Sequence, residues 1–159
     1  MDRPSRRTPR MGRRDLLRLT ALLPLSAVVA AGCTAQDKPP DPLVALARAA
    51  RADAVLARVA AESGVTQAEA VAQARREHAK ALQREIDRID PPEEDAPPPR
   101  DPAAPPAPNS AAAAKQELTE AMGRSGKQAA DLVAELPAHR AGLVGSVSAS
   151  CASLQEVLA

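Results

Sequence analysis

Between residues 41 and 159, apolar residues recur three and four positions apart, the spacing of one face of an α-helix. Four segments carry this pattern: 42–62, 66–90, 110–136 and 138–158. No stretch alternates between apolar and polar residues at period two, so no sheet is expected. The pattern therefore predicts an all-α fold of four helices.

Residues at the ends of these segments mark where helices start and stop. Asp41 and Pro42 give the first helix a capping side chain followed by proline at its first position. Gly64 ends that helix by adopting a left-handed conformation, and Asn109 or Ser110 is expected to cap the third helix. Thr66 and Glu69 have the spacing of a capping box, which predicts that each satisfies the other's backbone amide.

A proline-rich acidic linker covers residues 91–109. Nine of the 18 residues from Pro91 to Pro108 are proline, so the segment lacks amide donors and should be extended or disordered. At about 3.1 Å per residue it spans roughly 55 Å, whereas a 22-residue helix is about 33 Å long. We therefore expect two helical hairpins, 41–90 and 110–159, joined by one long crossover, as in ferritin-like four-helix bundles.

The spacing also predicts which residues face the core. The inner face of the second helix is expected to hold Val71, Ala74, His78, Leu82, Glu85, Ile86 and Ile89. The third contributes Ala111, Ala114, Leu118, Met122, Ser125, Ala129, Leu132 and Leu136, and the fourth Leu143, Val147, Cys151, Leu154 and Leu158. Such a core is small, because 33 alanines but only 21 Leu, Ile and Val residues follow Cys33. We expect close helix contacts through Gly142, Gly145, Ser146 and Ala149, and a partner that completes the core.

Composition excludes several kinds of binding site. The chain has no Phe, Tyr or Trp, so base stacking and aromatic cages are unavailable. The formal net charge is only +1, which argues against a general nucleic-acid binder.

The charge distribution predicts a signal peptide over residues 1–32. Residues 1–18 hold seven arginines and two aspartates, and residues 19–32 carry no charge. This apolar run of 14 residues includes Pro24, and a transmembrane helix needs roughly 20 residues. A cleaved signal is therefore favoured over a permanent span.

Arg13, Arg14, Leu16 and Leu17 resemble the twin-arginine export motif. The sequence departs from that motif at Gly12, where Ser or Thr is usual, and in having Leu16 where Phe is commonest. The alternative is an arginine-rich signal for the general export pathway. Either Met1 or Met11 is the start of translation.

Ala30, Ala31, Gly32 and Cys33 resemble a bacterial lipobox. The thiol at the first mature position receives a diacylglyceryl group, and small residues before it admit the signal peptidase. Two acyl chains anchor a protein stably, at about 0.8 kcal/mol per buried methylene. Residues 33–40 then form a tether on the extracytoplasmic face of the cell membrane. The alternative is an ordinary cleavage site with a coincidental cysteine.

Acylation of Cys33 leaves Cys151 without an intramolecular partner, a free thiol. Its expected role is that of a small buried hydrophobic residue, and the alternative is a redox thiol or a dimer crosslink.

Residues 75–85, from Arg75 through His78 to Glu85, resemble the histidine-bearing helix of ferritin-like proteins. Together with the leader and the alanine-rich helix pairs, the chain resembles twin-arginine-signal lipoproteins of actinobacteria. The resemblance implies an exported bundle and raises the hypothesis of a di-iron oxidase. Such a site needs Glu three residues before His, and Arg75 stands there instead. We expect no metal site, no cofactor and no catalytic residues.

His78 and Glu85 form a candidate polar pair on the core face. Seven residues separate them, about 10 Å along the helix axis, which is too far for a direct hydrogen bond. His78 is expected to be satisfied by a carboxylate from another helix, for instance Asp53.

The sequence thus favours a non-enzymatic, lipid-anchored helical bundle that binds a protein partner in the cell envelope. One alternative is a degenerate ferritin-like metal-binding protein or oxidoreductase. Another is a carrier of a small apolar ligand or lipid.

Overall fold

The computed structural model describes residues 39–159 of the chain. This part contains helices α2 (Pro42–Glu62), α3 (Ala68–Ile89), α4 (Ala111–Val133) and α5 (Ala138–Leu158), and within it no residue forms a strand. The prediction of an all-α four-helix bundle is confirmed.

The predictions for the leader lie outside the described residues. They are the signal peptide over 1–32, the start at Met1 or Met11, the export motif and lipobox, and the acylation of Cys33 with most of its tether. Between residues 39 and 159, no helix is both long and apolar enough to span a bilayer.

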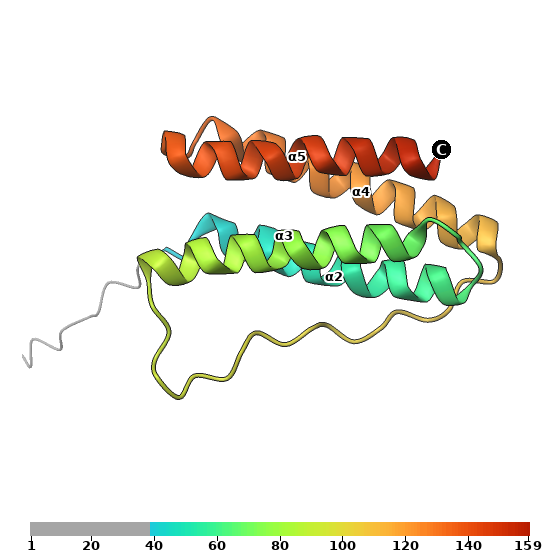
Figure 1. The fold of residues 1–159 in the computed structure, drawn as a ribbon, viewed down its shortest axis with the longest axis horizontal. Coiled ribbons are helices and arrows are strands. Elements are labelled where there is room, and N and C mark those ends of the chain that lie inside the picture. Colours follow the sequence, from blue (N-terminus) through green and yellow to red (C-terminus); the bar gives the residue numbers. More distant parts are fainter. Residues whose placement is uncertain (1–38) are drawn as a thin grey trace, which may run out of the picture. The chain divides into compact units, whose positions relative to one another are not determined.

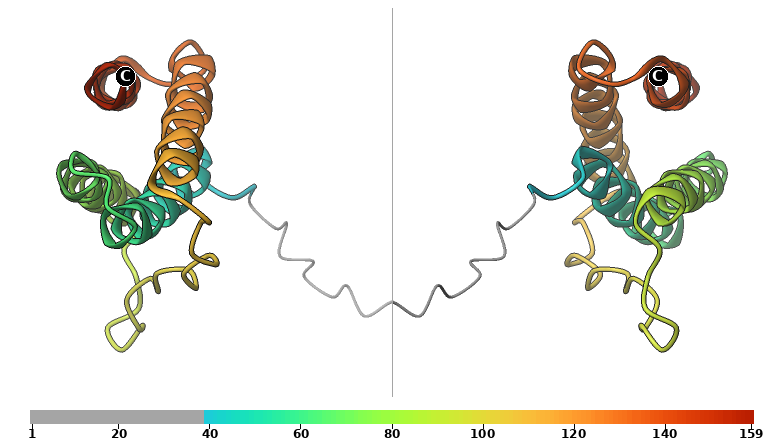
Figure 2. Two further views of the ribbon diagram at one scale, coloured as in Figure 1. Left: turned by 90° about the vertical axis from the view of Figure 1, so that its right-hand side faces the viewer. Right: turned by 90° about the vertical axis from the view of Figure 1, so that its left-hand side faces the viewer.

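Helices α2 and α3 form one hairpin and α4 and α5 form the other, with α2 packed against α4 (Figure 1). The linker runs back along the first hairpin, so α4 begins beside the α2–α3 turn and runs in the same direction as α3 (Figure 1). A methyl group on Gly64 in that turn would lie 3.9 Å from the Cβ atom of Ala111. Figure 2 shows the two hairpins end-on. The predicted long crossover is therefore present.

Most of the predicted helix ends are confirmed. The Asp41 carboxylate accepts a hydrogen bond of 2.9 Å from the amide of Leu43, and Ser110 Oγ accepts one of 3.1 Å from the amide of Ala113. Gly64 has a φ of 95°, a conformation that residues with a Cβ atom rarely adopt.

The predicted capping box between Thr66 and Glu69 is wrong. Helix α3 begins at Ala68, and its N-terminus has no side-chain cap. The amide of Ala68 donates instead to the carbonyl of Val65 at 3.1 Å, and the Glu69 carboxylate lies 3.2 Å from Arg76 Nη2. The N-cap position is Gln67, one residue after Thr66, so the capping spacing falls out of register.

The core consists of two apolar clusters along the bundle. The cluster near the α2–α3 turn includes Leu56, Val71, Leu118, Met122 and Leu158. The cluster at the other end includes Leu43, Leu82, Ile86, Val144 and Cys151. Between these clusters, α2, α3 and α4 each bury one polar residue, and these are Asp53, Arg75 and Ser125.

The inner face of α3 matches the predicted one in part, since Val71, Leu82 and Ile86 are buried. It differs in that Arg75 and Ala79 are buried, whereas Ala74, His78 and Glu85 are half-buried and Ile89 is 42% exposed. The charged residue Arg75 occupies a core position that the prediction gave to its neighbours. On α4 the predicted core residue Ala111 is exposed.

Close contact between α4 and α5 also differs from the expectation. Gly142, Ser146 and Ala149 on α5 are exposed, and a methyl group on Gly142 would meet nothing within 4 Å. The close approach occurs at Gly126 of α4, where an added Cβ atom would lie 3.2 Å from the Cβ atom of Cys151. A side chain at Gly126 would therefore crowd Cys151 on α5.

Candidate functional site

A buried polar layer crosses the bundle between the two apolar clusters. It is formed by Asp53, Arg75, Ser125 and Cys151, one residue from each helix, and His78 lies at its edge. Their exposures are 8% for Asp53, 1% for Arg75, 6% for Ser125 and 0% for Cys151. Buried charges are rare in proteins unless they are paired, so this layer is the first candidate for a functional site.

The Arg75 guanidinium is the centre of the layer. Its Nη2 and Nε atoms donate to Asp53 Oδ2 at 2.8 and 3.1 Å. Its Nη1 atom lies 3.0 Å from His78 Nδ1 and donates to Cys151 Sγ at 3.2 Å. One side chain of α3 is thereby connected to α2 and α5.

Ser125 connects helix α4 to the Asp53 carboxylate. Its hydroxyl donates to Asp53 Oδ2 at 2.6 Å, so this single oxygen accepts three hydrogen bonds. The charge-assisted bonds from Arg75 are stronger than neutral ones and offset part of the desolvation of the pair.

The ionisation of the layer follows from its burial. Burial raises the pKa of the Asp53 carboxyl, and the charge of Arg75 and the bond from Ser125 act against that rise. Burial and the charge of Arg75 lower the pKa of His78 to about 4. Because a guanidinium only donates, His78 Nδ1 accepts, and the imidazole is neutral with its proton on Nε2.

The Cys151 thiol is protonated in this setting. Burial raises its pKa, and the nearby Asp53 carboxylate adds to the rise, while Arg75 opposes it. A thiolate is the reactive form of cysteine, so a fully buried, protonated thiol is a poor nucleophile. Cys151 occupies the small, buried core position expected from the sequence, and it also accepts a bond from Arg75.

The candidate pair of His78 and Glu85 is not formed. His78 contacts Arg75, and Asp53, the partner expected for His78, is bonded to Arg75 instead. Glu85 accepts two bonds of 2.9 Å from Arg88, which lower its pKa.

Glu85 belongs to a second polar group at the end of the bundle where α5 begins. Arg140 Nη2 donates to both carboxylate oxygens of Asp41 at 2.7 Å, and its Nε atom lies 3.4 Å from Glu85 Oε1. Arg140 is only 7% exposed. It therefore holds the N-terminus of α2 against α3 and α5, directly after the predicted tether.

Within residues 39–159, no three or more His, Cys, Asp or Glu side chains gather in a way that suits a metal ion. A di-iron site needs a Glu three residues before its His. Arg75 holds that position before His78, and its guanidinium Nη1 atom lies 3.0 Å from His78 Nδ1.

Sequence reasoning missed Arg75 as a core residue, although a signal was present. Asp53 lies 11 residues before Gly64 and Arg75 lies 11 residues after it. Residues at equal distances from the turn of a helical hairpin lie opposite one another, so the two charges were placed to pair. The contact of Arg140 with Asp41 spans 99 positions and leaves no such local signal.

The chain was compared with models of protein families, with curated proteins and with solved structures, and none of them matches it.

Proposed function

We propose that the chain is an exported lipoprotein, anchored through Cys33 to the extracytoplasmic face of the cell membrane, whose helical bundle binds a protein partner. The observation that carries the proposal is the sequence Ala30-Ala31-Gly32-Cys33 after an uncharged apolar run and an arginine-rich start. The resemblance of Arg13 and Arg14 to a twin-arginine motif supports export of a folded bundle.

The geometry of the polar layer supports a binding role over a catalytic one. Arg75, Asp53 and Ser125 are bonded to one another between the apolar clusters, and the Cys151 thiol is buried and protonated. These groups are used in joining four helices. A rigid bundle of this kind suits a module that presents its surface to another molecule.

The outward face of α5 is the surface that we assign to the partner. Gly142, Ser146 and Ala149 lie three or four residues apart and are exposed. Small side chains at this spacing let the backbone of a second helix approach closely. The sequence suggested this face as a contact, and a partner outside the bundle accounts for its outward position.

Capture of the partner tests the proposal. The chain is expressed with an affinity tag in a bacterial host and purified from detergent extracts after crosslinking, in parallel with Ala149→Arg and Ala130→Arg. Ala130 is an exposed alanine of α4 and serves as the matched control. We expect one stoichiometric protein with the wild type and Ala130→Arg, and its loss with Ala149→Arg. Repeated recovery of no stoichiometric protein, or equal recovery with both variants, would contradict the proposal.

A further inference from the structure

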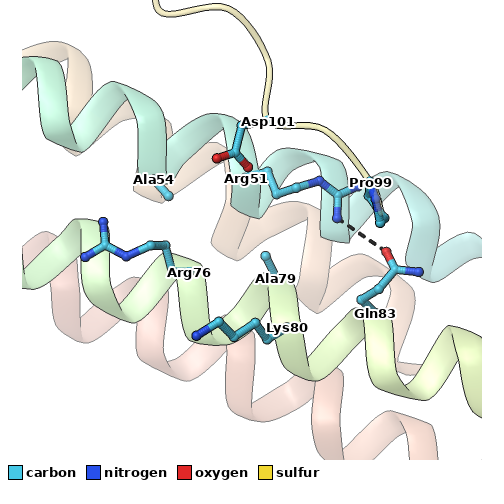
Figure 3. Close-up of a pocket in the computed structure, with 8 residues that line it drawn as sticks. All are labelled: Arg51, Ala54, Arg76, Ala79, Lys80, Gln83, Pro99 and Asp101. Carbon is cyan, nitrogen blue, oxygen red and sulfur yellow. Dashed lines mark hydrogen bonds between the residues drawn. The ribbon is translucent and has the colours of Figure 1, made fainter. Parts of the chain in front are cut away.

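A groove of about 280 Å³ lies between α2 and α3, on the face that the linker crosses (Figure 3). Its floor is made by Ala54 and Ala79, which are 5% and 6% exposed. Larger side chains at these two positions would fill the space between α2 and α3, whereas the two alanine methyl groups leave a groove there. Pro99 and Asp101 of the linker form the wall above it.

The groove gathers positive charge in a region that is negative overall. Residues 33–159 contain 14 Lys and Arg against 18 Asp and Glu, a balance of −4. The groove is nevertheless lined by three cations, Arg51 from α2 and Arg76 and Lys80 from α3, with Asp101 as the single carboxylate. Arg76 and Lys80 lie one helical turn apart, and Arg51 lies across the groove from them (Figure 3).

These cations have partners that a stronger anion would displace. Arg51 Nη1 donates to the neutral amide of Gln83 at 3.3 Å, a bond that joins α2 to α3. Arg76 is paired with Glu69 at 3.2 Å and Lys80 with Glu77 at 3.1 Å, and these two carboxylate side chains are 68% and 52% exposed. Exposed pairs of this kind contribute little to stability, so a bound anion can replace them at little cost.

We propose that this groove binds a phosphate monoester. Two guanidinium groups and one ammonium group from both sides of a narrow groove suit a doubly charged, tetrahedral oxyanion with three acceptor oxygens. The alanine floor accommodates a short apolar portion of the same molecule. Asp101 faces the bound phosphate and opposes it by charge, so the linker weakens binding. This site is distinct from the proposed protein-binding face and does not depend on the lipid anchor.

Titration of the full-length chain with glycerol 3-phosphate tests the inference, followed by the amide NMR signals of Ala54, Ala79 and Gln83. The groove variant is Arg76→Gln/Lys80→Gln. The matched control is Arg124→Gln/Lys127→Gln on α4, where two exposed cations are likewise paired with exposed carboxylates. We expect the groove variant to weaken binding by about tenfold or more, because it removes two of the three cations that line the groove. The control should bind within about twofold of the wild type.

Asp101→Asn provides a second variant, in the linker and outside every helix. It should tighten binding by about threefold, because it removes a like charge near the phosphate. Equal affinities for the groove variant and the control, or signal changes that spare the groove, would overturn the proposal.

Flotation with vesicles distinguishes a lipid headgroup from a free phosphate ester. Vesicles contain phosphatidylcholine with or without phosphatidic acid, and the groove and control variants share the same leader. In one outcome, no chain binds glycerol 3-phosphate, and only the groove variant loses its binding to vesicles with phosphatidic acid. This outcome supports the proposed site and identifies its ligand as a lipid headgroup. Binding of glycerol 3-phosphate alone supports it with a soluble ester. Binding of neither probe overturns the proposal, and leaves the partner-capture result to decide the protein-binding role.

Discussion

Arg75 Nη2 lies 2.8 Å from Asp53 Oδ2, and both side chains are buried between two apolar clusters of the bundle. The pair fixes the register of the first hairpin, since a shift of either helix would bury two unpaired charges. Ser125 and Cys151 extend the same constraint to the second hairpin. In a bundle whose core is rich in alanine, directional bonds of this kind select one packing arrangement among many of similar apolar burial.

The first prediction concerns the energetic coupling of this pair. Arg75→Met should lower the free energy of unfolding by about 3–5 kcal/mol, because it leaves the buried Asp53 carboxylate without its counter-charge. Arg75→Met/Asp53→Leu should recover most of that loss, since two apolar residues replace the whole pair. Urea denaturation of the full-length chain measures both. Arg124→Met removes an exposed pair with Glu120 and should cost under about 1 kcal/mol. Additive losses in the double variant would show that the pair is not coupled.

The second prediction concerns the dependence of stability on pH. The folded chain holds the pKa of His78 at about 4, below its ordinary value of 6.5. Between these values the unfolded chain binds more protons, so this contribution is complete above pH 6.5 and is lost as the pH falls towards 4. Its size is less than about 3 kcal/mol, because His78 is half-buried and solvent screens part of the effect.

The raised pKa of Asp53 acts in the opposite direction at low pH. The informative quantity is therefore the difference between the wild type and His78→Gln, measured by urea denaturation from pH 7 to pH 4. The advantage of the wild type should shrink across this range. A difference that stays constant with pH would contradict the neutral, half-buried state of His78.

The third prediction concerns the reactivity of Cys151. In a Cys33→Ser chain, Cys151 is the only thiol. It should react with a thiol reagent at pH 8 about a hundredfold or more slowly than in urea, because it is fully buried and its pKa is raised. The rate of colour release by a disulfide reagent measures this ratio. Rapid labelling of the native chain would instead favour a redox role.

The fourth prediction compares two glycines in helices. Gly142→Ala should raise the free energy of unfolding by about 1 kcal/mol, because the added methyl group meets nothing within 4 Å and alanine favours helix. Gly126→Ala gains the same propensity, but its methyl group would lie 3.2 Å from the Cβ atom of Cys151. Overpacking offsets the gain, so it should be less stable than Gly142→Ala by about 1 kcal/mol or more. Equal stabilities would show that α4 and α5 are not closely packed at Gly126.

Local signals in the sequence were enough to predict the helices and their connection. Asp41, Gly64 and Ser110 set helix ends through bonds or backbone conformations confined to a few residues. The proline content of 91–109 predicted an extended crossover because it removes amide donors. The capping-box prediction failed although its spacing matched, because the helix begins one residue later and Gln67 holds the N-cap position.

The candidate site was harder to predict because its contacts depend on how helices are rotated. The predicted inner face of α3 included His78 and Glu85 and omitted Arg75, although it placed Val71, Leu82 and Ile86 correctly. Asp53 and Arg75 are equally far from Gly64 along the chain, and this would have placed Arg75 on the inner face opposite Asp53. The contacts of Arg140 with Asp41 and of Ser125 with Asp53 join the two hairpins, so they depend on the packed bundle.

Mass spectrometry of the amino terminus of the chain, purified from the membranes of a bacterial host, tests most directly whether this protein is a lipid-anchored module. The account predicts a polypeptide that begins at Cys33 and carries a diacylglyceryl group on the sulfur, with residues 1–32 removed. A membrane-bound chain that retains residues 1–32, or a cleaved chain whose Cys33 carries no lipid, would contradict it.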